Sequence, residues 1–503
     1  MKKKFFEIFA SKTMAWLMIL VMAFLTGVSI LYRSYIDVTY QEVIHYRTDN
    51  AALAIGFLAV FIAILWYAGK KRTLKNISEK KLLILLLVFV AAVSGLWAYT
   101  SHSVPVADQK SVLDCVEGML NGNYECMSSK GYLQYNRHQV GLTLFYEIFF
   151  KIFTKGKVMY EAVYVLNTVL ITAIFFELYL ITKGLTDKKE VIILELLLSF
   201  GLFQLMLYST FVYGLIPGLF FALAGILWMQ KFLKTKKWYA GICMAICLAL
   251  AVVAKSNYLI FVVAVGAVLF VKAVNEKKNL YLIFAVLSVL LFVGFNSSAQ
   301  KVYEERSGIE FGDTIPNSIY IAMGMQEGAM APGWFNGYNH VTYRNNDYNQ
   351  DVTDKIAKEY IRERVGEFIE NPQECLEFYY YKIVSQWNEV TYESFWISMN
   401  EINHGRELSP MVQELYTGKL HTIAEAVMNL YQLLLFAGTL CMAWCFRKKT
   451  DISKFILLIC ILGGFLFHIL WEGKSQYIIS YFPLMLPCAA IGLREVLQRK
   501  KER

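Results

Sequence analysis

Charged residues are scarce in this chain: only 18% of its 503 residues are charged, whereas 57% are hydrophobic. A soluble protein of this length could not cover so many apolar side chains with polar surface, so the composition argues against a soluble enzyme. Apolar runs of about 20 residues, the length that crosses a hydrocarbon core of about 30 Å, recur along the whole sequence. The sequence therefore predicts a polytopic membrane protein.

Other patterns are also missing. The first apolar run follows "MKKKFFEIFASK" without a small-residue cleavage site, so we expect it to remain as a helix. No strand alternation and no internal repeat stands out, which favours an all-α fold. No histidine or carboxylate completes a metal-binding set around the cysteines of the apolar runs, so neither a metal nor a cofactor is predicted, and no nucleic-acid partner is expected. Cys115 and Cys126 lie in a polar segment and could form a disulfide in an oxidising compartment.

The distribution of basic residues predicts the orientation of the spans. Seven segments that alternate with the predicted outer loops hold 29 of the 49 basic residues and 8 of the 40 acidic ones, a net charge of +21. The rest of the chain carries −12. Because basic loops stay in the cytoplasm, both termini are expected to be cytoplasmic. The twelve predicted spans are at about residues 13–32, 51–69, 82–100, 159–182, 190–208, 210–229, 238–254, 257–273, 279–297, 422–446, 453–471 and 477–495.

One apolar run does not fit this alternation. Val140–Thr154, "VGLTLFYEIFFKIFT", is almost long enough to cross the membrane, but a crossing here would move every later basic loop to the outside. Glu147 and Lys151 would also be costly at the middle of the bilayer. We therefore expect this segment to lie along or dip into the outer leaflet, although a short genuine span with misassigned neighbours is the alternative.

These expectations divide the chain into five parts. Two helices are predicted in the second outer segment, one over "DVTDKIAKEYIRERVGEFIENP" and one beginning at Pro372, from their capping residues and apolar spacing. The parts are three N-terminal transmembrane helices (1–100), a first large outer loop with juxtamembrane helices (101–158), a six-helix membrane core (159–297), an outer, mainly helical segment (298–421), and three C-terminal transmembrane helices with a basic cytoplasmic tail (422–503).

Three cations on the predicted outer face suggest a site for an anionic lipid headgroup. Lys474 lies in "WEGKSQY", a loop too short to leave the headgroup layer, and Lys255 lies in an equally tight outer turn. Each lysine either anchors at the interface without specificity or holds one chosen phosphate. Arg137 could add a bidentate contact to the same phosphate.

A carboxylate stands opposite these cations. Asp108 follows the third predicted span and begins an amphipathic segment that also carries Asp114 and Glu117. Asp37, after the first span, is the competing candidate, but its loop lacks the tyrosines and amides that follow Asp108. We expect Asp108 to be partly buried beneath Val140–Thr154, which would raise its pKa.

The stretches "PVADQKSVLDCVEGMLNGNY", "GYLQYNRHQVGLTLFYEIFFKIF" and "YEAVYVLNTVLITAIFFELYLITK" together resemble the opening module of the GT-C superfamily of membrane glycosyltransferases. That superfamily includes protein O-mannosyltransferases, aminoarabinose transferases of lipid A and Rgt-type sugar transferases. "YSTFVYGLIPG" looks like an outer turn of a later helix pair, and "WEGKSQYIISYFPLMLP" is similar to a late E…[RK]…Y stretch that many members carry. Here Asp108 is followed by Gln109 rather than a second acid, and two predicted spans precede the module.

The resemblance implies transfer of a sugar from a polyprenyl-phosphate carrier to a hydroxyl group of a cell-envelope glycan, lipid or protein, on the outer face of the cell membrane and with inversion. It implies that Asp108 is the general base and that Lys474 is the first phosphate contact. A transporter or flippase, or a polymerase-like protein that handles lipid-linked glycans, is the alternative. The remaining expected substrate-binding residues are Lys255, Arg137, Tyr132, Asn136, His138, Gln139, Glu472 and Tyr477.

Overall fold

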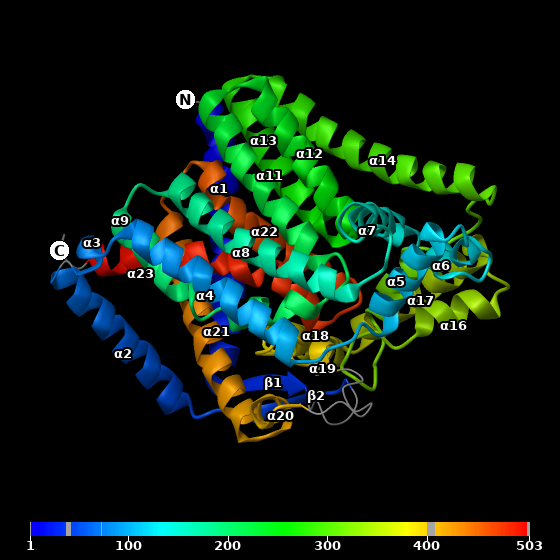
Figure 1. Ribbon diagram of the computed structural model, residues 1–503. Coiled ribbons are helices and arrows are strands. Elements are labelled where there is room, and N and C mark those ends of the chain that lie inside the picture. Colours follow the sequence, from blue (N-terminus) through cyan, green and yellow to red (C-terminus); the bar gives the residue numbers. More distant parts are fainter. Residues whose placement is uncertain (1, 37–41, 72, 400–407, 500–503) are drawn as a thin grey trace.

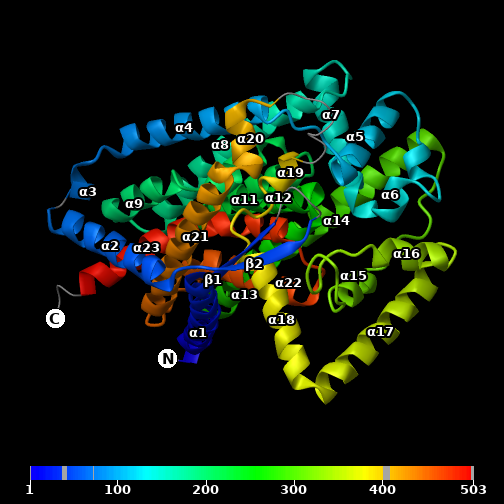
Figure 2. The same cartoon turned by 90° about the horizontal axis from the view of Figure 1, so that it is seen from below.

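The computed structural model describes residues 2–36, 42–71, 73–399 and 408–499, and most of them are helical. The long helices form one bundle around a large apolar core, and a smaller group of outer elements lies at one end of it (Figures 1 and 2). The start of α1 and the end of α23 lie away from this group, which contains α5, α6, α16 and α17.

Ten helices in the described part of the chain are long and apolar enough to cross a membrane. The bent pair α9 (Lys189–Ser199) and α10 (Phe203–Leu207) would be an eleventh span, and α12 (Trp238–Ala254) is apolar but has 17 residues. The prediction of an all-α, multi-pass membrane protein is confirmed, but the count of twelve spans is not. Seven of the ten are the helices α1 (Lys2–Leu31), α2 (Ala51–Lys70), α4 (Glu79–Thr100), α8 (Tyr160–Leu185), α11 (Leu215–Thr235), α14 (Leu280–Ser307) and α21 (Lys419–Phe446). The other three reach this length together with the 3₁₀ turns that precede them, and they contain α13 (Leu259–Glu276), α22 (Ile456–Leu470) and α23 (Met485–Arg499).

Shorter elements make up the outer group and the connections. The short helices are α3 (Thr73–Asn76), α5 (Ala107–Leu120), α6 (Tyr132–Tyr135), α7 (Val140–Phe153), α15 (Ser318–Met323), α16 (Tyr338–Asn345), α17 (Gln350–Glu370), α18 (Pro372–Trp387), α19 (Trp396–Met399) and α20 (Pro410–Thr417). The 3₁₀ turns are η1 (Glu125–Met127), η2 (Arg137–Gln139), η3 (Tyr208–Thr210), η4 (Ser256–Tyr258), η5 (Ile452–Phe455), η6 (Ser475–Ser480) and η7 (Phe482–Leu484).

Helices α17 and α18 confirm the two helices predicted in the second outer segment. The side chain of Asn349 accepts a hydrogen bond from the Val352 amide at 2.9 Å and so caps the start of α17. Asn371 caps α18 in the same way, and Pro372 occupies its first turn, where a missing N–H group costs nothing. The two helices form an open V in Figure 2.

A two-stranded sheet in the first outer loop was not predicted. Strands β1 (Tyr32–Ile36) and β2 (Ile44–Thr48) pair antiparallel with Ser34 opposite Tyr46. The strand amide of Ser34 also donates to the Asn388 carbonyl at 3.1 Å, which ties the hairpin to α18. Five-residue strands are too short for alternation to stand out against the neighbouring apolar runs.

Helix α7 corresponds to the segment that broke the predicted alternation of loops. Its 14 residues extend about 21 Å, less than the hydrocarbon core of a bilayer. The buried carboxylate of Glu147 accepts hydrogen bonds from Tyr303 at 2.7 Å, Arg306 at 2.9 Å and Lys151 at 2.7 Å. Because Tyr303 and Arg306 belong to the C-terminal part of α14, these bonds hold α7 beside that end of α14.

Accessibility labelling tests this topology. We expect single cysteines at Lys130, Lys157 and Asn345, introduced into a cysteine-free background, to react with an impermeant thiol reagent added from outside. All three side chains are exposed, and the first two bracket α7. Protection at Lys157 together with labelling at Lys130 would mean that α7 crosses the membrane.

The predicted Cys115–Cys126 disulfide is not present in the structure. Both cysteines are free thiols, although they contribute to the same apolar cluster under α5 and η1.

Candidate functional site

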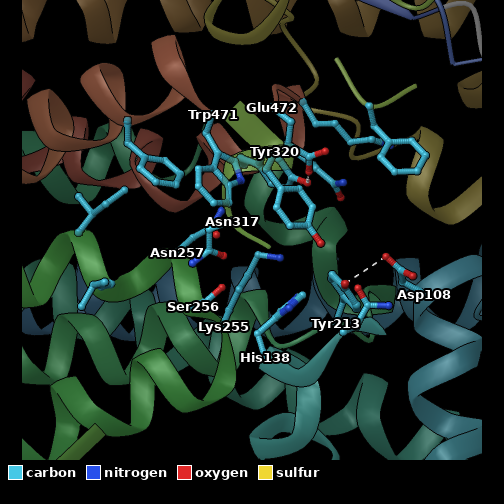
Figure 3. A pocket seen from close by; sticks show the side chains of 18 of the residues that line it. Asp108, His138, Tyr213, Lys255, Ser256, Asn257, Asn317, Tyr320, Trp471 and Glu472 are labelled. Carbon is cyan, nitrogen blue, oxygen red and sulfur yellow. Dashed lines mark hydrogen bonds between the residues drawn. The ribbon is translucent and has the colours of Figure 1, made fainter. Parts of the chain in front are cut away.

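A cavity of about 950 Å³ lies where the N-terminal end of α13 and the C-terminal end of α22 meet α5, η2 and the segment around α15 and α16 (Figure 3). It brings together side chains that are up to several hundred residues apart in the sequence. Of the ten predicted site residues, eight line it: Asp108, Asn136, His138, Gln139, Lys255, Glu472, Lys474 and Tyr477.

Asp108 occupies the first turn of α5 and is exposed to the cavity. The Tyr213 hydroxyl donates a hydrogen bond to its Oδ2 atom at 3.0 Å, and Gln139 Nε2 donates to the same hydroxyl at 2.7 Å. The neighbouring Gln109 side chain accepts a bond from the Val212 amide at 2.9 Å. These contacts fix the start of α5 against the 212–213 segment, so one carboxylate oxygen is oriented while the side chain stays open. The partial burial expected for Asp108 is therefore not observed.

Lys255 follows α12 in extended backbone and points into the centre of the cavity. Its Nζ atom lies 4.5 Å from the centroid of the Tyr213 ring and 5.5 Å from that of Tyr477. Within the described residues, no carboxylate forms an ion pair with it. Burial lowers the pKa of Lys255 to about 8, although the charges of Asp108 and Glu472 oppose the shift. This lysine is therefore a cation whose charge is not neutralised by direct contact.

Lys474 differs from Lys255 because it forms an ion pair with Glu42. Burial works against the charge of Lys474, but Glu42 and Glu393 raise its pKa above the ordinary value. Sequence reasoning missed Glu42, which follows the first span and reaches this lysine through the hairpin. Lys474 still lines the cavity, but a carboxylate already balances its charge.

Two further groups on the cavity wall have shifted pKa values. The protein that encloses the cavity, together with the charge of Lys255, lowers the pKa of His138 to about 4. Burial raises the pKa of Glu472, whose Oε1 atom accepts a hydrogen bond from Tyr477 at 2.7 Å. His138 is therefore uncharged at neutral pH, so it offers a hydrogen-bonding ring rather than a third cation.

Two predicted site residues do not line the cavity. Arg137 donates to the Gly312 carbonyl, and its guanidinium lies over the Phe311 ring. Tyr132 packs among the apolar side chains under α5, and its hydroxyl lies close to Tyr213 and Asp108. Asp37, the competing acid, lies outside the described residues. Within the described part of the chain, no group of three histidine, cysteine or acidic side chains could hold a metal ion.

The other half of the cavity is apolar. It runs between α13 and α22, and the polar backbone turn η4 stands at its head beside Lys255. Several of its α13 side chains are exposed, among them Val263 at 63% and Leu259 at 40%. Its apolar lining is Leu259, Ile260, Val263 and Ala264 on α13, with Ile459 and Phe467 on α22.

Aromatic side chains of the site were also missed by sequence reasoning. Tyr320 stacks on Trp471 at 5.3 Å, and Trp471 stacks on Phe467 at 5.1 Å, so three rings form one wall. Tyr213 lies in the quoted stretch "YSTFVYGLIPG", yet no spacing rule links it to Asp108. Only tertiary packing brings these rings to the cavity.

No family model matches this chain, and no curated protein matches it. Two solved structures from Archaeoglobus fulgidus are similar in chain path. One is the archaeal oligosaccharyltransferase AglB in complex with an inhibitory peptide and a dolichol-phosphate, with 13% identity, a TM-score of 0.43, and coverage of 83% of this chain and 50% of that one. The other is an oligosaccharyltransferase in the apo form, with 13% identity, a TM-score of 0.44, and coverage of 85% and 51%. This chain thus spans about half the length of either, and similarity at this level assigns no activity or residue.

Proposed function

We propose that this protein is a membrane glycosyltransferase of the GT-C type, which moves a sugar from a polyprenyl-phosphate carrier to an acceptor hydroxyl on the outer face of the membrane. One observation carries the proposal: a single cavity joins an apolar channel, an unpaired lysine at its head and an exposed carboxylate. An amphiphilic donor needs these three environments in this order.

The donor side is formed by α13, α22 and Lys255. A polyprenyl chain would lie in the apolar channel, where its transfer from water is favourable and its isoprene units meet only hydrocarbon side chains. The phosphate would then lie at the head of the channel, beside η4 and Lys255. We propose Lys255 as the first phosphate contact, because none of the described carboxylates forms an ion pair with it, with Lys474 as a more distant contribution.

The reaction follows from the positions of Asp108 and Lys255. The acceptor oxygen attacks the anomeric carbon as its proton passes to the Asp108 carboxylate. The new bond joins acceptor oxygen to anomeric carbon, and the bond between that carbon and the phosphate oxygen breaks. Its electron pair stays on the polyprenyl phosphate, whose increased negative charge Lys255 stabilises. A single displacement of this kind inverts the anomeric centre.

Residues near Asp108 would orient the reacting groups. The Tyr213 hydroxyl orients Asp108 through one carboxylate oxygen, and the exposed carboxylate would accept the acceptor proton. Neutral His138 and the amides of Asn136 and Gln139 offer hydrogen bonds without competing for the phosphate charge. Glu472 and Tyr477, which are hydrogen-bonded to each other, would form the wall of the site beside the donor sugar.

Sidedness is part of the proposal. The predicted outer loops carry the net negative charge, and the cavity is built from them together with the adjoining helix ends. The first and last helices begin and end away from these elements (Figure 1). We therefore place both termini in the cytoplasm and the cavity at the outer leaflet.

A transporter is the weaker candidate. It would need ionisable groups along a path through the bilayer, and Glu177 of α8 and Glu195 of α9 are buried in the apolar helices. Neither contributes to the lining of the 950 Å³ cavity, as far as the described residues show. The cavity chemistry therefore favours the transferase.

Product analysis tests the proposal directly. We expect the purified protein, incubated with a panel of polyprenyl-phosphate sugars, to release polyprenyl phosphate, which thin-layer chromatography separates from the donor. Water should replace a missing acceptor at a low rate, so release should be detectable with donor alone. A protein that moves such lipids between leaflets of a vesicle without cleaving them would contradict the proposal.

The pKa of Lys255 gives the reaction a predicted pH dependence. Below about pH 8 this lysine is charged, and above it the free enzyme loses the cation that binds the donor phosphate. We therefore expect kcat/KM for the donor to fall as pH rises through about 8, because this parameter reports groups of the free enzyme. The titratable groups that face Lys255 are Asp108, His138, Tyr213, Glu472 and Tyr477.

The variant Lys255→Arg identifies the group that titrates. Arginine stays protonated throughout the accessible range, so the decline above pH 8 should disappear while activity at pH 7 is partly retained. A decline of the same shape in Lys255→Arg would assign the titration to another residue.

A further inference from the structure

Four rings form a row that leads outward from the cavity. Phe335 and His340 line the cavity and lie 6.3 Å apart between ring centroids. His340 is followed by Tyr135 at 5.8 Å, and Tyr135 by Tyr348 at 5.8 Å. These four side chains, here called the aromatic row, come from α6, α16 and the turns beside them, so no single element produces the arrangement.

The row is only half-buried, which separates it from the core beneath it. Tyr343 packs against Tyr135 and Tyr348 from below and is 1% exposed. Tyr135, His340 and Tyr348 each keep part of their surface accessible. A ring that served only as core would be covered like Tyr343, so the row offers aromatic surface to a molecule that approaches the cavity from the outer side.

The base of the row is rigid. The Gln134 side chain contacts both Gly312 and Asp313, Arg137 donates to the Gly312 carbonyl, and Thr314 donates to the Tyr135 carbonyl at 3.1 Å. Arg137, which was expected to contact the phosphate, therefore supports the base of the aromatic row instead. These bonds hold Tyr135 in place, and a surface fixed before binding loses less entropy when a ligand occupies it.

Backbone strain fixes the outer end. Asp347 has φ of 54° and Tyr348 has φ of 59°, two consecutive left-handed residues that are not glycine. Such conformations are unfavourable for side chains with a Cβ atom and persist only where surrounding contacts impose them. The Tyr348 ring lies beside the Tyr135 ring, and the Lys130 Nζ atom lies 5.9 Å from the centroid of the Tyr348 ring.

The chemistry of the row suits a saccharide better than a peptide. Rings combined with amides, here Asn136 and Asn339 at the cavity end, match a polyol that presents both C–H faces and hydroxyl groups. Asn339 is 2% exposed and its Oδ1 atom has no partner within the described structure. A peptide would favour a free strand edge, but Gly473, the extended residue near the cavity, already donates to Gly333 at 2.8 Å.

We propose that the acceptor is an oligosaccharide, and that the aromatic row binds its successive sugar units while the terminal hydroxyl reaches Asp108. This inference rests on the proposed transferase activity and specifies its acceptor. It assigns Phe335 and His340 to the sugars nearest the reacting hydroxyl, and Tyr135 and Tyr348 to sugars farther along the chain. Recognition therefore depends on acceptor length.

Binding measurements on the full-length protein in detergent test the assignment. The probes are malto-, cello- and chito-oligosaccharides of two to six units, and serine- and threonine-containing peptides of similar length, all measured by native mass spectrometry. We expect the wild type to bind at least one saccharide series, more tightly as length increases. Tyr348→Leu should weaken binding of the longest members about threefold to tenfold, as the loss of one ring contact implies, and leave the disaccharide unchanged.

Tyr360→Leu is the matched control, because Tyr360 is also a half-buried tyrosine but pairs with Tyr338 outside the row. Equal weakening by Tyr348→Leu and Tyr360→Leu would overturn the assignment, as would binding without length dependence, preference for the peptides, or no saccharide binding at all. If the wild type binds saccharides with length dependence but releases no carrier phosphate, the proposed reaction fails and the saccharide site stands.

Discussion

Replacing Asp108 with asparagine should reduce sugar transfer at least about 100-fold, the lower end of what a general base contributes. Asparagine keeps the size of the side chain and can still accept a hydrogen bond from Tyr213, but its amide cannot take the acceptor proton. Because the donor phosphate lies at Lys255 in this scheme, donor binding should survive. The measurement is single-turnover transfer from a polyprenyl-phosphate sugar, combined with equilibrium binding of the same lipid.

Asp114→Asn provides the matched control on the same helix. Asp114 is exposed and pairs with Lys110 at 2.5 Å one turn away, a surface ion pair of small energetic value. Transfer by this variant should stay within about twofold of wild type, since surface substitutions of this kind change stability by only about 0.5 kcal/mol. Near-normal transfer in Asp108→Asn, with an inactive Asp37→Asn enzyme, would move the catalytic base to the first outer loop.

The second large effect is expected at Lys255. Lys255→Ala removes the cation nearest the leaving phosphate in a partly enclosed site, where loss of one charge-stabilising donor typically costs about 100-fold or more in rate. Lys255→Arg should retain a measurable part of this activity because the charge remains, although the geometry of the guanidinium differs. Donor affinity and single-turnover rate should both fall in the alanine variant.

Lys474→Ala should behave differently from Lys255→Ala. Its removal leaves Glu42 buried without its ion-pair partner, and breaking such a pair costs about 3–5 kcal/mol of folding free energy. We therefore expect a lower thermal unfolding midpoint in detergent, with a smaller effect on donor affinity of the folded protein than Lys255→Ala produces. A fully stable Lys474→Ala variant with the larger donor defect would restore Lys474 as the first phosphate contact.

The sequence could not decide whether Lys255 or Lys474 is the better candidate for the first phosphate contact. Both lie in tight turns on the predicted outer side, so position along the chain does not separate them. The difference is Glu42, which stands 432 residues before Lys474 and reaches it through a hairpin that the sequence did not predict. Arg137 shows the same limit, because its charge and position suggested a phosphate contact but the Gly312 carbonyl binds it.

Other features depend on patterns that local sequence does contain. Asn349 and Asn371 are the N-cap residues of α17 and α18, and Pro372 occupies the first turn of α18. The segment that begins at Asp108 was expected to be amphipathic, and it forms the helix α5, which ends at Leu120 with Asn121 as its cap. Capping and periodicity act over a few residues, so a linear sequence is sufficient to find them.

The sequence by itself determined that this is a helical multi-pass membrane protein, because hydrocarbon length and hydropathy are properties of consecutive residues. It also identified Asp108, Lys255 and their amide neighbours as candidates, since polar residues beside apolar helices are few. Only the tertiary structure decided which of them share one cavity, which charges are already balanced, that Tyr213 contacts Asp108, and that the aromatic row adjoins the cavity. Those properties depend on distances between residues far apart in the chain, and electrostatic and stacking contacts act only over a few ångströms.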